Sequence, residues 1–95
     1  MSGSSVSDQP YRVQATGQAR RDMEQLPEAV AAACFEFVAG ALAAAPRRVG
    51  KPLTGPLKGR YSARRGSYRV IYRILETDHV VQVLHVDHRG TVYRR

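Results

Sequence analysis

One eight-residue segment, 68–75, limits what this chain can fold into more than any other. It alternates strictly, is rich in β-branched and aromatic residues, and reads Tyr-Arg-Val-Ile-Tyr-Arg-Ile-Leu. This pattern predicts a β-strand with two different faces. The face with the two tyrosines resembles a protein core, and the opposite face, with Arg69 and Arg73, is expected to be only partly covered. The chain therefore needs a sheet that is packed on one side and carries arginines on the other.

Helical patterns precede this strand. Residues 11–15 alternate as a short strand would, and Thr16 is a suitable N-cap for a helix that continues to Leu26. Pro27 suits the first position of a second helix, because its missing N–H has no partner there. The alanine-rich run from Glu28 to Ala45 continues this helix, and its helical spacing forms an apolar stripe of Val30, Cys34, Phe37, Ala41 and Leu42.

After these helices, proline and glycine make residues 46–59 irregular, and a turn at 76–79 joins the strand at 68–75 to another at 80–87. Alternation in that last strand places Val83, His85, Asp87 and Arg89 on one face, and Gln82, Leu84, Val86 and His88 on the other. The predicted fold class is α+β, in which an N-terminal strand and a two-helix hairpin pack with a small antiparallel sheet. The Ser/Gly-rich residues 1–10 are predicted to be a disordered leader, and 11–95 a single domain.

Composition excludes several protein classes. The single cysteine, Cys34, has no partner for a disulfide, and no set of Cys and His residues has zinc-ligand spacing. No apolar run is long enough to span a bilayer, and no nucleotide-binding or zinc-protease motif occurs. We therefore expect a cytoplasmic protein that uses no metal or cofactor and does not enter the membrane.

The charge is concentrated in one part of the chain. The formal net charge is +7, and residues 47–75 contain nine basic residues and no acidic residue. Such a run is either a solvated basic face or a surface for a polyanion, and guanidinium groups favour phosphate as the ligand. From this run we expect Lys51, Lys58, Arg60, Arg65 and Arg73 to bind the substrate.

The same region suggests a way to cleave RNA without a metal. If the last two strands pair, Arg64, Arg69, Arg89 and Tyr93 converge over one face of the sheet. The 2′-hydroxyl of RNA is an internal nucleophile, so the protein needs only to remove its proton, stabilise the phosphorane and protonate the leaving oxygen. Tyr93 can act as the base where guanidinium groups favour its phenolate, and His88 or His85 can act as acid or base. Each of these residues also has a purely structural interpretation.

The segments SARRGSYRVIYRI (62–74) and VLHVDHRGTVYRR (83–95) resemble the RelE/ParE superfamily of bacterial type II toxins, in particular its RelE-like branch. The Leu26-Pro27 junction and the approach from Lys51 to Tyr61 extend this similarity over nearly all of residues 11–95. The resemblance implies a toxin that is an endoribonuclease: it cuts mRNA in the ribosomal A site by 2′-hydroxyl attack, and a cognate antitoxin neutralises it.

Position by position, the resemblance implies that Arg69 steadies the scissile phosphate, and that Arg89 acts as leaving-group acid or charge stabiliser. It also implies that Tyr93 is the general base, and that Arg64 helps to bind phosphate. The sequence leaves two alternatives open. One is a ParE-like inhibitor of DNA gyrase, and the other is a non-catalytic basic module that binds nucleic acid.

Overall fold

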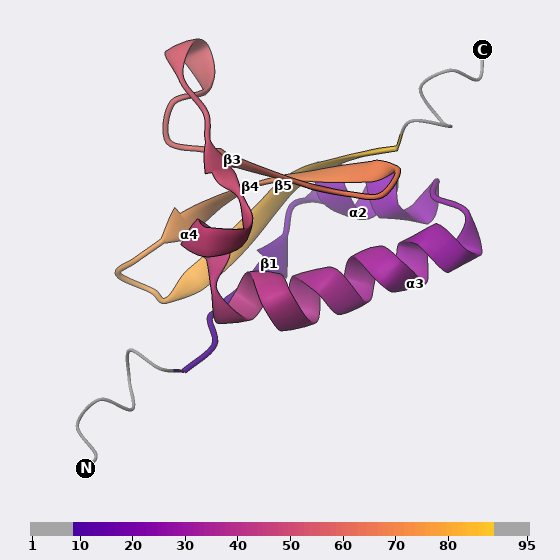
Figure 1. Ribbon diagram of the computed structural model, residues 1–95, viewed down its shortest axis with the longest axis horizontal. Coiled ribbons are helices and arrows are strands. Elements are labelled where there is room, and N and C mark those ends of the chain that lie inside the picture. Colours follow the sequence, from indigo (N-terminus) through magenta and orange to yellow (C-terminus); the bar gives the residue numbers. More distant parts are fainter. Residues whose placement is uncertain (1–8, 89–95) are drawn as a thin grey trace.

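The computed structural model describes residues 9–88, in which helices cover one face of a five-stranded sheet (Figure 1). Of the predicted leader, 1–10, only Gln9 and Pro10 lie within this range. The strand order is β1-β5-β4-β3-β2. The strands are β1 (Arg12–Ala15), β2 (Lys51–Pro52), β3 (Tyr61–Arg65), β4 (Tyr68–Leu75) and β5 (Val80–His88).

The predicted α+β architecture is confirmed, with one correction to the sheet. β1 pairs in parallel with β5, whereas the other neighbouring strands are antiparallel. The sheet is therefore mixed, although we expected an antiparallel one. Sequence alternation identifies a strand but does not specify the direction of its neighbour, because that direction depends on how the long crossover through the helices returns the chain.

The helical hairpin begins and turns close to the predicted residues. α2 (Gly17–Glu24) follows Thr16, whose side-chain oxygen accepts a hydrogen bond from the Ala19 N–H at 3.1 Å. α3 (Glu28–Phe37) begins one residue later than predicted, because Pro27 has an extended ψ of 149° and is the N-cap. No helix within residues 9–88 is long and apolar enough to cross a membrane.

A π-helical turn, η1 (Val38–Leu42), continues α3 and changes which residues enter the core. Cys34, Phe37 and Leu42 are buried as predicted, and Val30 packs beside them. Ala41 is exposed, contrary to the prediction, and Val38 and Ala43 are buried instead. The wider π turn adds one residue before the helix again faces the sheet, so the apolar stripe advances by one position.

The predicted irregular region 46–59 contains three short elements: α4 (Pro46–Val49), β2 and η2 (Gly55–Leu57). It is anchored to the core through Tyr72, which is fully buried and donates a hydrogen bond from its hydroxyl to the Pro46 carbonyl at 2.5 Å. Burial raises the pKa of Tyr72 to about 12. Gly50 lies against the same hydroxyl, so a β-carbon at this position would collide with it.

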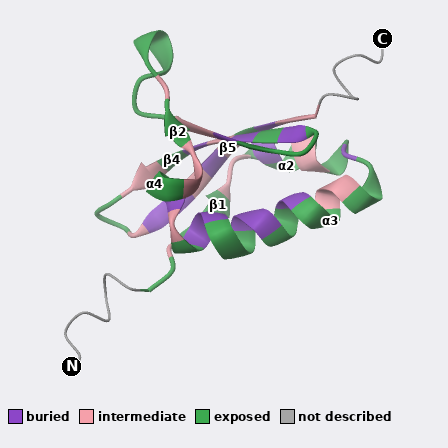
Figure 2. Ribbon diagram, in the orientation of Figure 1, coloured by how far each residue is buried: buried purple, intermediate pink, exposed green. Residues whose placement is uncertain are grey.

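The two faces of β4 differ as its sequence predicts. Tyr68, Val70 and Tyr72 are buried toward the helices, whereas Arg69 and Arg73 are exposed on the other side (Figure 2). The core lies between this buried side of the sheet and the inner side of α3 and η1.

β5 differs from its prediction because it contains a β-bulge. Ile71 pairs with His85 and Tyr72 pairs with Val83, which leaves Leu84 as an extra residue. Val83 and Val86 therefore both face the core, and His85 and Asp87 face away from it. The alternation predicted over 80–87 is correct only up to the bulge, because an extra residue reverses the faces of everything after it.

Candidate functional site

The face of the sheet away from α2 and α3, which we call the open face, gathers much of the basic run. Directly paired residues project from the same side of a sheet, so the strand register identifies its members. One row across β3, β4 and β5 consists of Arg64, Arg69 and Asp87, and the next row consists of Ser62, Ile71 and His85.

Arg64 and Arg69 lie directly opposite each other in the ladder between β3 and β4, and both are exposed. β-Carbons in such a pair are about 5 Å apart, and like charges at this separation destabilise a sheet. An anion between the two guanidinium groups reverses this effect, and each planar fork can bind a phosphate through two hydrogen bonds. The sequence correctly predicted that these two arginines converge over one face.

A tight hairpin sets the position of both arginines. Arg65 pairs with Tyr68, so the loop between β3 and β4 consists only of Gly66 and Ser67. Gly66 has a φ of 55°, a conformation that residues with a β-carbon rarely adopt but that a two-residue hairpin turn requires. The short turn fixes the register between β3 and β4, and Arg64 therefore stays opposite Arg69.

Four other predicted substrate-binding residues lie on the open face or on the segment that carries η2. Lys51 pairs with Ser62 and so lies at the β2 edge of the open face. Arg73 lies on the same face and donates from its Nε to the Gln82 side-chain oxygen at 2.8 Å. Lys58 and Arg60 are exposed on the segment that carries η2, which projects from the sheet on the side opposite α3 (Figure 1).

Two predicted site residues are not brought to the open face. Arg65 lies on the helix side of the hairpin, with its guanidinium carbon 4.7 Å from the centre of the Phe37 ring. His88 pairs with Tyr68, and its Nε2 is 3.1 Å from the Ser67 hydroxyl. Arg89 and Tyr93 lie outside the described residues, and their predicted roles stay predictions.

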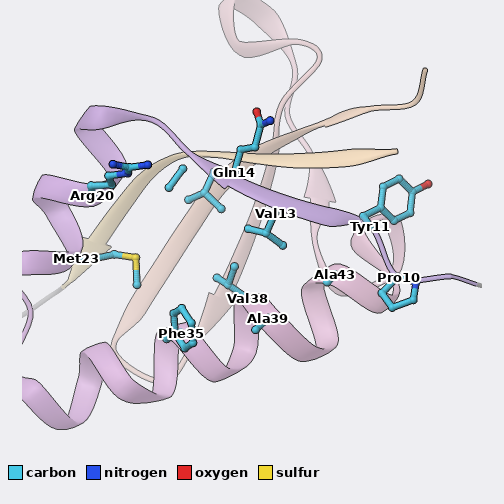
Figure 3. A pocket seen from close by; sticks show the side chains of 12 residues that line it. Pro10, Tyr11, Val13, Gln14, Arg20, Met23, Phe35, Val38, Ala39 and Ala43 are labelled. Carbon is cyan, nitrogen blue, oxygen red and sulfur yellow. The ribbon is translucent and has the colours of Figure 1, made fainter. Parts of the chain in front are cut away.

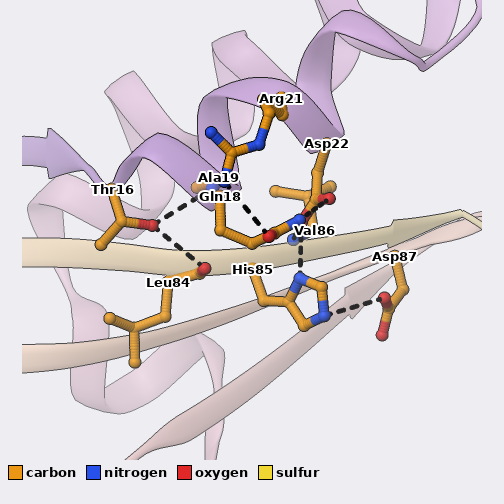
Figure 4. Close-up of polar contacts among 9 residues, drawn as sticks. All are labelled: Thr16, Gln18, Ala19, Arg21, Asp22, Leu84, His85, Val86 and Asp87. Carbon is orange, nitrogen blue, oxygen red and sulfur yellow. Dashed lines mark hydrogen bonds and ion pairs between the residues drawn. The ribbon is translucent and has the colours of Figure 1, made fainter.

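The structure adds a polar cluster that the sequence did not reveal. His85 on the open face points its Nδ1 at Asp22 of α2, 2.5 Å away, and its Nε2 lies 3.8 Å from an oxygen of Asp87 (Figure 4). Asp22 also accepts hydrogen bonds from the Val86 N–H at 3.0 Å and from Gln18 at 2.8 Å. Burial acts to raise the pKa of Asp22, but these hydrogen bonds outweigh it and hold the pKa below its usual value.

Cys34 is a structural residue, as its position in the apolar stripe predicts. It is fully buried, and burial raises the pKa of its thiol to about 11, which suppresses the reactive thiolate. Within residues 9–88, no group of three or more His, Cys, Asp and Glu side chains is placed to hold a metal ion.

A separate apolar groove lies on the helix side of the molecule, between β1, α2 and the α3–η1 helix (Figure 3). Its volume is about 740 Å³, and its lining includes Val13, Met23, Phe35 and Val38. Phe35 is 64% exposed and Val13 is 37% exposed, although both are large apolar side chains. Because β1 is also the edge of the sheet, the groove is open to an additional polypeptide segment.

Comparison with known proteins reveals close relatives. Residues 13–93 match the family model described as the ParE toxin of the type II toxin–antitoxin system parDE. The chain is 51% identical to Toxin RelE of Mycobacterium tuberculosis over 92% of its length and 90% of that protein's. It is also 51% identical to Toxin RelG of the same organism, over 90% of its length and 99% of that protein's.

A solved structure agrees with these sequence relatives. A chain in the crystal structure of the M. tuberculosis toxin–antitoxin complex RelBE2 superimposes with a TM-score of 0.84 and 51% identity. The match covers 85% of this chain and all of that one.

Proposed function

Because this chain belongs to the RelE/ParE family of type II toxin–antitoxin toxins, we propose that it is a ribosome-dependent mRNA endonuclease. In this proposal it acts in the cytoplasm, cuts mRNA in the ribosomal A site without a metal, and so inhibits translation. A cognate antitoxin holds it inactive. The observation that carries the proposal is the pair of exposed arginines, Arg64 and Arg69, that face each other on the open face.

The chemistry requires little from the protein, because RNA brings its own nucleophile. Arg69 and Arg64 hold the non-bridging oxygens of the scissile phosphate and neutralise the charge that develops on the phosphorane. Tyr93 takes the proton of the attacking 2′-hydroxyl, and Arg89 adds positive charge at the reacting phosphate. Lys51, Lys58, Arg60 and Arg73 bind neighbouring phosphates of the same strand.

We expect the reaction to depend on the ribosome, because an exposed sheet face binds an RNA strand without aligning its reacting atoms. In-line attack requires the 2′-oxygen, the phosphorus and the leaving oxygen to be aligned, and alignment accounts for a large share of the barrier. A shallow face that grips phosphates does not by itself impose this geometry on a flexible strand. The ribosome supplies an immobilised codon, so we expect little cleavage of free RNA.

For the antitoxin we propose the apolar groove as a docking site. The similar chain of known structure comes from a toxin–antitoxin complex, and the groove combines an exposed Phe35 with the free edge of β1. An amphipathic antitoxin segment would cover Phe35 and Val13. Acidic residues along the margins of that segment would be attracted to this toxin, whose net charge is +7.

Inhibition of DNA gyrase is the second candidate, because the matching family model describes a ParE toxin. In that case the basic surface binds a protein and performs no chemistry. The two functions make different demands on single arginines: a gyrase inhibitor distributes its binding energy over a broad surface, whereas a nuclease depends steeply on the few groups that touch the reacting phosphate.

The test uses ribosomes stalled on a defined mRNA with an empty A site, with 5′ ends mapped by primer extension. We expect a new end within the A-site codon for the wild-type protein, and none for Arg69→Ala or for free RNA. Arg48→Ala is the charge-matched control, because Arg48 is exposed on α4, and the first residue of α4, Pro46, contacts Tyr72 on the buried side of the sheet. Intact mRNA from a protein that blocks gyrase supercoiling would overturn the nuclease proposal in favour of the second candidate.

A further inference from the structure

The β-bulge in β5 gives His85 a position that regular strand geometry would deny it. Val81 and Val83 are buried in the core, and regular alternation would send the side chain two residues further along into the core as well. The extra residue, Leu84, turns His85 onto the open face, one row from Arg69. Bulges commonly re-aim side chains in this way beside active sites.

Helix α2 fixes the orientation of the imidazole ring of His85. Its Nδ1 is 2.5 Å from the carboxylate of Asp22, which belongs to α2, and Asp22 is itself held by the Val86 N–H at 3.0 Å. The Asp22 side chain is only 14% exposed, whereas that of His85 is 48% exposed. The ring is therefore anchored on one side and open to solvent on the other.

The second ring nitrogen remains available to a ligand. Nε2 lies 3.8 Å from Asp87, which is within ion-pair range but too long for a hydrogen bond. The charged groups that face the ring are Asp22 from α2, Asp87 from β5 and, in the adjacent row, Arg69 and Arg64. Rows on one face of a sheet are about 7 Å apart, a separation that an arginine side chain can span, so a phosphodiester bound by the two arginines can place an ester oxygen near Nε2.

We propose that His85 is the general acid of the cleavage reaction and that Asp22 is its positioning residue. This inference rests on the proposed nuclease function. The 2′-oxygen forms a bond to phosphorus as its proton passes to the base, and the bond from phosphorus to the 5′-oxygen breaks. That oxygen takes the Nε2 proton of a protonated His85, leaving a neutral imidazole, a 2′,3′-cyclic phosphate and a 5′-hydroxyl. Arg89 then serves only as a charge stabiliser, because guanidinium does not give up its proton readily.

A bridging sulphur atom tests the acid role directly. We would place a 5′-phosphorothiolate at the bond that the wild-type protein cuts in stalled ribosomes, since a thiolate leaves without being protonated. His85→Gln should cut the ordinary linkage about 100-fold more slowly than wild type, and the sulphur linkage within about threefold of wild type. Equal losses on both linkages, or no loss on the ordinary linkage, would overturn the assignment.

Two further variants separate chemistry from structure. Asp22→Ala should slow cleavage of the ordinary linkage more than cleavage of the sulphur linkage, because it removes the contact that orients the proton-donating ring; equal losses on both linkages would contradict the positioning role. His79→Asn, in the β4–β5 turn, is the histidine control and should cut at the wild-type rate. If the wild-type protein cuts neither linkage, the nuclease function itself is wrong, whereas wild-type cutting without sulphur rescue refutes only the role of His85.

Discussion

Replacing Asp22 with asparagine should weaken the attachment of α2 to the edge of β5. The carboxylate accepts hydrogen bonds from the Val86 N–H at 3.0 Å and from Gln18 at 2.8 Å, and it contacts the His85 ring at 2.5 Å. The contacts with Val86 and His85 join residues more than sixty positions apart, and the first of them satisfies a backbone N–H of the strand.

The magnitude follows from the kind of hydrogen bond that is lost. Bonds to a charged group contribute about 1.5–3 kcal/mol each, and bonds between neutral groups about 0.5–1.5 kcal/mol. The asparagine oxygen can still accept from the Val86 N–H and contact His85, but only at neutral strength, and the NH₂ group that replaces the second oxygen cannot accept from Gln18. The free energy of unfolding should therefore fall by about 1–3 kcal/mol at pH 7.

The stability lost in Asp22→Asn should depend on pH, and the pKa of Asp22 determines in which direction. Its folded-state pKa lies below the unfolded value of about 3.9, so the carboxylate stabilises the protein above that pH. The contribution disappears as the pH falls through the folded-state pKa. Wild type and Asp22→Asn should therefore differ at pH 7 and converge toward pH 3.

Urea unfolding followed by circular dichroism measures this difference. For a domain of this size, a loss of 1–3 kcal/mol lowers the urea midpoint by about 1–2 M. Asp78→Asn is the matched control, since Asp78 is an exposed acid in the β4–β5 turn and should change stability by less than about 0.5 kcal/mol. Equal midpoints at pH 7, or a difference that persists unchanged at pH 3, would refute the account of Asp22.

Three further outcomes are expected. Gly50→Ala and Tyr72→Phe should each cost about 1–3 kcal/mol of unfolding free energy, the first by collision with the Tyr72 hydroxyl and the second by leaving the Pro46 carbonyl unpaired. The double variant should lose less than the sum in urea titrations, because removing the hydroxyl makes room for the new methyl group; strict additivity would contradict the packing described for Gly50. Phe35→Ser should leave stability within about 0.5 kcal/mol yet weaken antitoxin binding at least tenfold in calorimetry, whereas an unchanged Kd would place the antitoxin elsewhere. Affinity for RNA should fall steeply with salt, and Arg69→Ala should reduce the slope of log K against log[salt] by about one; an unaltered slope would mean that Arg69 contacts no phosphate.

The local elements of this fold follow from its sequence, because each depends on neighbouring residues. Alternation over 68–75 predicted which face of β4 is buried, and Thr16 marked the start of α2. The π turn and the β-bulge did not follow, since each inserts one residue without a distinctive sequence signal. Their effects are large because a shift of one position moves Ala41 out of the core in one case and reverses the faces of β5 after Leu84 in the other.

In the candidate site too, the local arrangement was predictable from the sequence and the long-range contacts were not. The convergence of Arg64 and Arg69 was predictable, because two adjacent strands joined by a short Gly-Ser turn can pair in few ways. The cluster around His85 was not, because it needs both the bulge and a carboxylate from a helix 63 residues earlier in the chain. Interactions between distant segments form only when the whole fold is in place.

The central claim is that RNA is cut on the open face, and two neighbouring arginines on opposite faces of the sheet test it most directly. Arg64→Ala and Arg65→Ala remove the same charge from adjacent positions, one facing Arg69 and the other lying over Phe37. Single-turnover cleavage of mRNA on stalled ribosomes should slow at least tenfold for Arg64→Ala, the equivalent of about 1.4 kcal/mol, and far less for Arg65→Ala. Equal losses, or a greater loss for Arg65→Ala, would contradict the assignment of the reaction to the open face.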